Sequence, residues 1–113
     1  MAENCVFCKL ALRQIPVEPL YEDEEFLAFH DMNPQAPVHV LLIPKAHFTS
    51  VMDVTDSGLL GRAMEAVKQT AHTLGLAEEG FRIVVNTGEN GGQTVAHLHF
   101  HLLGGRFMQW PPG

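Results

Sequence analysis

Three histidines near the C-terminus recur at every second position, within the stretch QTVAHLHFHLLGG that spans residues 93–105. Side chains alternate between the two faces of a β-strand, so a strand here would place His97, His99 and His101 on one face. Three imidazoles on one face can bind a metal ion, or they can divide a nucleophilic reaction at phosphorus among them. The opposite face would be apolar and typical of a core, with Leu98, Phe100 and Leu102.

The residues that precede the histidines favour chemistry at phosphorus. The stretch NTGENGGQT, residues 86–94, has glycines whose backbone N–H groups can approach a phosphate closely, and Gln93 and Thr94 add side-chain donors. No Asp or Glu occurs from Gly91 to the C-terminus, although catalytic zinc and magnesium sites usually involve carboxylates. A neutral imidazole can attack phosphorus through one nitrogen if its other nitrogen is held as a hydrogen-bond donor.

A second pair of chemically active residues, Cys5 and Cys8, has the spacing of half a structural zinc site. The same spacing occurs in redox pairs, but the βαβ context that such a pair needs is missing. Two cysteines three positions apart do not make a secreted disulfide framework, and in an intracellular protein they indicate metal ligands first. A tetrahedral zinc site would need two further ligands from elsewhere in the chain.

Length and composition are those of one globular domain, expected to span residues 1–113. Hydrophobic residues make up 46% of the chain and charged residues 18%, which excludes a disordered protein. The net charge of −6 argues against nucleic acid or an anionic membrane surface as the main partner. The N-terminus lacks the pattern of a signal peptide, and no apolar run approaches the roughly 18 residues of a membrane span. We therefore expect a cytoplasmic protein.

The apolar pattern along the chain predicts an α+β fold rather than a series of βαβ units. Two short strands flank the acidic turn at 22–25, and apolar runs at 38–44 and 81–86 predict two more strands. The histidine segment would supply the last strand. Strands dominate, and the short connections between them favour antiparallel pairing.

Two helices are predicted, one short and one long. Residues 5–14 have apolar positions at helical spacing, and the long helix lies within 54–75. Asp56 or Ser57 can cap the start of the long helix, and Gly75 can end it. The apolar stripe expected on the long helix consists of Leu60, Ala63, Met64, Val67, Ala71 and Leu74.

The sequence resembles the histidine triad family, whose signature is His-x-His-x-His followed by two apolar residues, here HLHFHLL at 97–103. The resemblance covers nearly the whole chain: IPVEPLYEDEEFLAFHDMNPQAPVHVLLIPKAH is similar to the family's N-terminal half, and GGQTVAHLHFHLLGGR to its active-site half. The ending WPPG resembles the Hint branch, the purine nucleoside phosphoramidases. This resemblance implies an antiparallel sheet of about five strands with one long and one short helix. It also implies hydrolysis of the P–N bond of nucleoside 5′-phosphoramidates through a nucleotidyl-histidine.

The resemblance implies a division of labour among the histidines. His99 would be the nucleophile, and its second nitrogen would donate to a backbone carbonyl. His101 would bind a phosphate oxygen and help the leaving group, and His39 in APVHVLLIP would support it from the neighbouring strand. Thr94 stands where close relatives often carry Ser, which keeps the hydroxyl. The remaining implied substrate-binding residues are Phe29 and Met32 for the base, Asp31 for the ribose, and Asn86, Gly92, Gln93 and Thr94 for the phosphate and ribose.

A zinc site and a homodimer are also implied by the resemblance. Family members with the cysteine pair bind zinc through the histidine of PKAH and the first histidine of the triad. The corresponding ligands here are Cys5, Cys8, His47 and His97, and the zinc would be structural. Two subunits would pair through the long helix and an edge strand, with Trp110 near the partner's active site.

Two alternative functions remain open. The chain could be a dinucleoside polyphosphate hydrolase of the same family, or a nucleotide-binding, zinc-stabilised interaction module with little turnover. The intact triad and the adjoining glycine-rich loop favour an enzyme. The purine preference and the physiological amine are not defined by the sequence.

Overall fold

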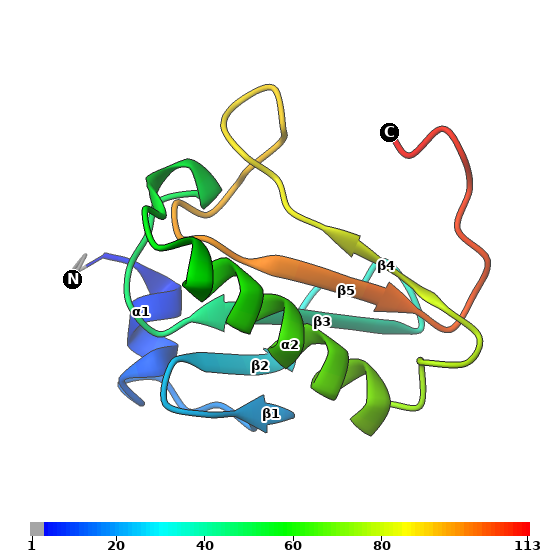
Figure 1. The fold of residues 1–113 in the computed structure, drawn as a ribbon, viewed down its shortest axis with the longest axis horizontal. Helices are drawn as coiled ribbons and strands as arrows, with labels where there is room; N and C mark the ends of the chain where they lie inside the picture. Colours follow the sequence, from blue (N-terminus) through cyan, green and yellow to red (C-terminus); the bar gives the residue numbers. More distant parts are fainter. Residues whose placement is uncertain (1–3) are drawn as a thin grey trace.

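Five antiparallel strands form the centre of the structure, a computed structural model that describes residues 4–113 (Figure 1). Their order across the sheet is β1–β2–β3–β5–β4, so β1 and β4 are the edge strands. This confirms the predicted α+β fold with one long and one short helix. Within the described residues, no helix is both long and apolar enough to cross a membrane. The elements are α1 Val6–Ala11, β1 Tyr21–Glu22, β2 Phe26–His30, β3 Val38–Pro44, the 3₁₀ turn Val51–Asp53, α2 Ser57–Thr73, β4 Phe81–Val84 and β5 Phe100–Gly104.

The sheet buries apolar residues on both faces, because each face is covered by a helix. Alternate residues of the central strands, such as Phe26 and Leu42, pack under α2 in the larger core. Their neighbours, such as Leu27 and Ile43, face α1 and form a smaller core. The triad segment lies in the same alternation, since Leu98, Phe100 and Leu102 are buried in the core under α2. The histidines between them are therefore left on the α1 side, as predicted.

The triad segment enters the sheet later than predicted. Strand β5 begins at Phe100, opposite Leu42 of β3, so only His101 of the three histidines lies within it. The segment before Phe100 turns away from the ladder, where the backbone N–H of Leu98 donates to the carbonyl oxygen of Phe48 at 2.7 Å. His97 therefore reaches past the end of β3 rather than pairing along it.

Helix α2 packs on the sheet through small residues. Asp56 caps its N-terminus, with its side chain accepting a hydrogen bond from the N–H of Gly58, and Gly75 follows its end at φ +72°. The predicted stripe is correct for its small members but wrong for two residues: Leu60 is only half-buried, and Met64 is exposed. The contact face is rotated toward Leu59 and Ala66, because the docking of the helix on the sheet decides which of two adjacent apolar faces is buried. The residues buried on α2 are Leu59, Ala63, Ala66, Val67, Thr70 and Ala71.

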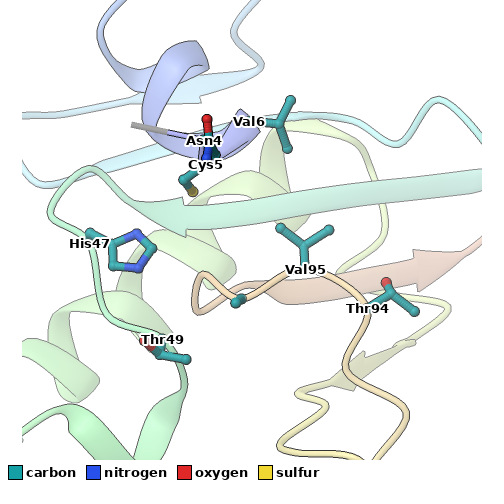
Figure 2. Close-up of a pocket in the computed structure, with 8 residues that line it drawn as sticks. Asn4, Cys5, Val6, His47, Thr49, Thr94 and Val95 are labelled. Atoms are coloured by element: carbon teal, nitrogen blue, oxygen red, sulfur yellow. The ribbon is translucent and has the colours of Figure 1, made fainter. Parts of the chain in front are cut away.

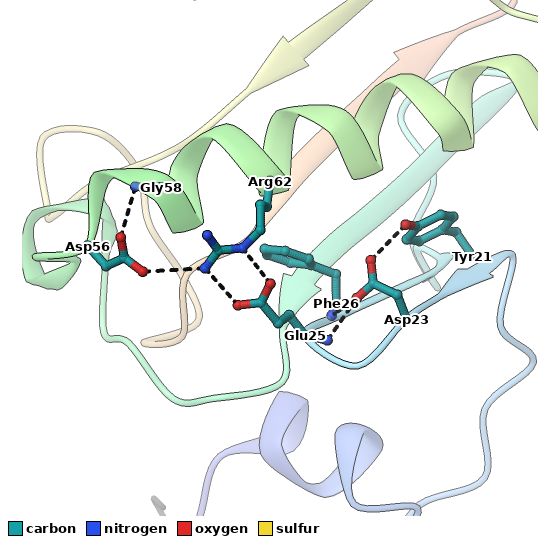
Figure 3. A network of polar contacts seen from close by, with 7 residues as sticks. All are labelled: Tyr21, Asp23, Glu25, Phe26, Asp56, Gly58 and Arg62. Carbon is teal, nitrogen blue, oxygen red and sulfur yellow. Dashed lines mark hydrogen bonds and ion pairs between the residues drawn. The ribbon is translucent and has the colours of Figure 1, made fainter.

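A polar network ties the start of α2 to the β1–β2 turn (Figure 3). The Arg62 guanidinium donates to both carboxylate oxygens of Glu25, at 2.6 and 3.0 Å, and also reaches Asp56. Asp23 accepts from the turn's backbone N–H groups and from the hydroxyl of Tyr21. These groups are largely exposed to solvent, so we expect the ion pairs to add little to stability. The network fixes the turn that leads into β2 and lies away from the histidines.

Candidate active site

A cavity of about 410 Å³ opens on the α1 side of the sheet, beside the last two histidines of the triad. Strands β2, β3 and β5 supply its floor, and α1 supplies one wall. Seven of the residues predicted to form the site meet here. They are Phe29, Asp31, Met32, His39, Thr94, His99 and His101.

His99 is held in one tautomer by the backbone. Its ring is 4% exposed, and Nδ1 lies 2.7 Å from the carbonyl oxygen of His97. A carbonyl can only accept, so Nδ1 carries a proton, and in a neutral His99 the Nε2 atom keeps its lone pair. The edge of the Phe7 ring packs against the imidazole, with ring centroids 5.1 Å apart. The neutral ring is thereby oriented with an unprotonated nitrogen available as a nucleophile.

A chain of hydrogen bonds sets the tautomers of the two neighbouring histidines. The backbone N–H of Gln35 donates to Nδ1 of His39 at 3.0 Å, so the proton of a neutral His39 is on Nε2. That Nε2–H lies 2.9 Å from Nδ1 of His101 and 3.4 Å from Oδ2 of Asp31. Because Nδ1 of His101 accepts, a neutral His101 carries its own proton on Nε2. His101 can then donate a hydrogen bond to an anion in the cavity.

Both histidines are kept neutral by their surroundings. Burial, together with neighbouring His99 and His39, lowers the pKa of His101 to about 4. Burial also lowers the pKa of His39, although the Asp31 carboxylate acts in the opposite direction. The hydrogen-bond directions given above therefore hold at neutral pH.

The glycine-rich loop, residues 86–94, lies beside the cavity, and Thr94 at its end lines the cavity. The Gln93 side chain accepts from the N–H of Gly88 at 3.0 Å and donates to the carbonyl oxygens of Thr49, at 2.6 Å, and Val95, at 3.0 Å. Its amide thus holds the loop to the segment after β3. Gly91 is required by packing, because a Cβ there would lie 2.3 Å from the carbonyl oxygen of Thr87.

Four predicted substrate-binding residues do not line this cavity: Asn86, Gly92, Gln93 and Trp110. The first three belong to the loop just described or to its approach. Trp110 is 79% exposed, and the Arg82 guanidinium lies 6.0 Å from the centre of its ring. Arg82 is on the edge strand β4, which places Trp110 apart from the cavity within one chain.

Two contributions to the site were not predicted from the sequence. Helix α1 lines the cavity with Val6, Phe7 and Leu10, which the helical pattern assigned only to a core. The N–H of Gln35 orients His39 through the backbone, so its residue type carries no signal. Phe7 could have been found, because it lies between two cysteines that were expected to meet the first triad histidine.

A second side-chain cluster, formed by Cys5, Cys8, His47 and His97, has the arrangement of a metal site. Sγ of Cys5 lies 3.2 Å from Nδ1 of His97, and Sγ of Cys8 lies 3.6 Å from the same atom. Nδ1 of His47 is 3.1 Å from Nδ1 of His97. Sγ of Cys8 is 3.2 Å from Nδ1 of His47. Tetrahedral coordination with Zn–S and Zn–N bonds separates ligand atoms by about 3.3–3.8 Å. The Nε2–H of His97 donates to the carbonyl oxygen of Pro44 at 2.8 Å, which leaves Nδ1 aimed at the other ligands. These four residues could hold a metal ion.

A smaller cavity of about 390 Å³ borders this cluster (Figure 2). Cys5 and His47 lie on its wall, so the cluster is reached from this side. Val6, Thr94 and Val95 line both cavities and therefore separate the cluster's entrance from the triad cavity. The other residues that line the smaller cavity are Asn4, Thr49 and Ala96.

Comparisons with known proteins agree with the triad geometry. The HIT domain family model matches residues 13–108. An uncharacterized HIT-like protein of Synechococcus elongatus is 50% identical over an alignment that covers all of both chains. Protein HitA of Neisseria gonorrhoeae is 47% identical over 104 residues, which cover 90% of this chain and 96% of HitA. The structure of a HIT family hydrolase from Legionella pneumophila superimposes with a TM-score of 0.93, at 50% identity, covering 97% of this chain and 100% of that one. The chain therefore belongs to the HIT domain family, the family of the histidine triad.

Proposed function

We propose that this protein hydrolyses the P–N bond of purine nucleoside 5′-phosphoramidates, as a member of the Hint branch. The observation that carries the proposal is the contact between Nδ1 of His99 and the His97 carbonyl oxygen, which leaves Nε2 of the neutral ring with its lone pair, in a residue that lines the same cavity as His101 and Asp31. The similarity to the Legionella HIT family hydrolase supports an enzyme over a binding module.

The cavity offers separate surroundings for each part of a nucleotide. Its volume of about 410 Å³ lies in the range of small-molecule sites. Phe29 and Phe7, whose ring centroids are 5.8 Å apart in an edge arrangement, supply an apolar wall for the base, and the exposed Met32 lies at the rim of the cavity. Asp31 supplies a carboxylate for the ribose hydroxyls. The phosphate would then lie between His99 and Thr94, with the loop N–H groups nearby.

The proposed reaction has two displacement steps. The lone pair on Nε2 of His99 forms a bond to phosphorus while the P–N bond breaks, and the nitrogen leaves as an amine after taking a proton from solvent. The Nε2–H of His101 donates to the phosphate oxygens, where negative charge develops. Water then attacks the nucleotidyl-His99, releases a proton and restores the neutral imidazole. One water is consumed, and a nucleoside monophosphate and an amine are formed.

We also propose zinc for the Cys5, Cys8, His47 and His97 cluster, in a structural role. Two thiolates and two imidazoles are a ligand set that zinc prefers. A bound zinc would supply a crosslink between α1 and the residues that flank the triad. It would supply no chemistry at phosphorus, because the nucleophile and its partners lie in the other cavity.

We also propose that the protein is a cytoplasmic homodimer in which each subunit is a single HIT domain. Strand β4 is an edge strand, and unpaired edges are generally covered or paired. Light scattering at micromolar concentration should give twice the 12.5 kDa chain mass, and a monomer would contradict the dimer. Two exposed apolar residues lie at this edge: Ile83 on β4 itself, and Trp110, whose ring lies beside Arg82 of β4.

Turnover of adenosine 5′-phosphoramidate, measured beside diadenosine polyphosphates, tests the proposal. We expect the phosphoramidate to be the better substrate by kcat/KM. Faster cleavage of the polyphosphates would favour a dinucleoside polyphosphate hydrolase. Nucleotide binding without turnover of either substrate would favour a binding module.

A further inference from the structure

One short helix serves two sites at once. Within α1, Cys8 contributes a cluster ligand, and Cys5 contributes another from the N-cap position. The same turn of helix lines the nucleotide cavity with Val6, Phe7 and Leu10. Cluster ligands and residues of the cavity wall are therefore interspersed between Cys5 and Leu10, and neither set can move without the other.

The position of α1 depends on its contacts with the rest of the protein. A six-residue helix is too short to be stable in isolation, so its place is set by the surfaces it touches. On the sheet side, Phe7 packs in the smaller core with Leu27, Phe29 and Leu41. On the other side, the cysteines meet His47, from the segment after β3, and His97.

Phe7 is the physical link between the two sites. Its ring meets the edge of His97, a cluster ligand, with centroids 5.7 Å apart, and meets His99 at 5.1 Å. The same ring is in edge contact with Phe29, and the two rings together form the apolar wall of the proposed base pocket. A displacement of α1 away from the cluster would remove one side of that pocket.

We propose that a metal ion at the Cys5–Cys8–His47–His97 cluster positions the base-binding wall of the nucleotide cavity. Metal affinity and nucleotide affinity are thereby linked. Cys5 and Cys8 are positioning residues for substrate binding that do not touch the substrate. This inference rests on the proposed nucleotide function and on zinc as the ion. Linkage is reciprocal, so the factor by which zinc tightens nucleotide binding equals the factor by which the nucleotide tightens zinc binding.

The test compares AMP binding by calorimetry to reduced protein with one equivalent of zinc and to the same protein after chelation. We expect AMP to bind at least tenfold more weakly without zinc, and re-addition of zinc to restore its affinity. Ribose 5-phosphate has no base to contact α1, so its affinity should change much less. Zinc affinity, measured by chelator competition with and without saturating AMP, should change by the same factor as AMP affinity.

Two variants separate positioning from general stability. Cys5→Ser with Cys8→Ser should bind AMP as weakly as the chelated protein and should not respond to zinc. Val67→Ala, in the core under α2, removes buried apolar atoms away from α1 and should leave AMP affinity unchanged. Circular dichroism establishes that each protein compared is folded.

The possible failures are distinguishable. Zinc-loaded, folded protein that does not bind AMP would overturn the proposed nucleotide function and this inference with it. Equal AMP affinities with and without zinc would overturn this inference alone. The inference also fails if the protein takes up no zinc, or if ribose 5-phosphate and AMP lose affinity equally on chelation.

Discussion

The Nε2 atom of His39 lies 2.9 Å from Nδ1 of His101, and the backbone N–H of Gln35 fixes the direction of this hydrogen bond. His39 therefore orients His101 and fixes the nitrogen on which a neutral His101 carries its proton. The relationship links the loop after β2 to the strand that carries the third histidine of the triad. It also predicts different effects for substitutions of the two histidines.

Replacing His101 should lower kcat more than replacing His39, and the effects of the two substitutions on kcat should not be additive. His101→Ala removes one donor to the transition-state oxygens, so we expect kcat to fall by about 10²-fold. His39→Ala leaves His101 in place but unoriented and should cost less. Because His39 acts through His101, the double variant should match His101→Ala. Steady-state kinetics on all three proteins gives the answer, and fully additive losses would contradict the relay.

Arg106 should support the relay by holding the backbone of Gln35 in place. Its Nη2 donates to the Gln35 carbonyl oxygen at 2.9 Å, while the N–H of Gln35 donates to His39. Arg106→Met should lower kcat by up to about tenfold with little change in KM, because small displacements of catalytic groups are costly. Arg106→Lys keeps a donor and should lose less. Arg62→Met breaks an exposed ion pair away from the cavity and serves as the control, with kcat unchanged.

Stability should fall as the pH is lowered from about 6.5 toward 4. The pKa of His101 is about 4 in the folded protein against an ordinary value of 6.5, so in this window the unfolded chain binds a proton that the folded chain does not. The free energy of unfolding then decreases with falling pH, by up to about 3 kcal/mol from this residue. The lowered pKa of His39 acts in the same direction. Urea unfolding of wild type and His101→Gln across this range should show a shallower pH dependence for the variant. Parallel curves would contradict the assignment.

Metal removal should lower thermal stability without abolishing the chemistry. Elemental analysis of protein kept reduced should find about one zinc per chain, held by two thiolates and two imidazoles. Chelation or the Cys5→Ser, Cys8→Ser variant should lower Tm, because metal binding is linked to folding. Hydrolysis at saturating substrate should remain appreciable. Complete loss of turnover in a folded, zinc-free protein would make the metal catalytic.

Much of the fold could be predicted because its signals are local. The caps of α2, the apolar runs of the central strands and the period-2 pattern around His97 each depend on neighbours in sequence. The start of β5 could not be predicted in this way, because it depends on segments that are distant in sequence. Strand β5 pairs with β3 only from Phe100 onward, and the N–H of Leu98 donates to the carbonyl oxygen of Phe48 instead. The buried face of α2 could not be predicted for a similar reason: it depends on how the helix docks on the sheet, which buries Leu59 and Ala66 and leaves Met64 exposed.

The site was predicted where residue type carries the chemistry. The expected carbonyl partner of His99 is present as the His97 oxygen, and the four expected metal ligands meet in one cluster. Backbone groups such as the Gln35 N–H leave no trace in the sequence. Gln93 is the opposite case: its side chain is of a type that could bind substrate, but it donates to the Thr49 carbonyl oxygen and so holds its own loop in place. The wall formed by α1 was missed because apolar residues that line a cavity have the same pattern as those that fill a core.

His99→Ala should retain nucleotide binding while losing turnover. The substitution removes the nucleophile, and no second residue in the cavity has an unprotonated nitrogen held in the same way. We expect kcat/KM to fall by at least ~10³-fold, equivalent to about 4 kcal/mol of barrier. AMP affinity should be retained, since Asp31, Phe29 and the loop remain. A variant within tenfold of wild type would contradict the assignment of the nucleophile.

The covalent intermediate is the central claim, and rapid chemical quench tests it most directly. Wild-type protein mixed with radiolabelled adenosine 5′-phosphoramidate and quenched within one turnover should carry the label on the peptide that contains His99. The bond to an imidazole nitrogen should be labile in acid and stable in base, and His99→Ala should carry no label. Turnover by wild type with no trapped label, or a label on another residue, would contradict the account.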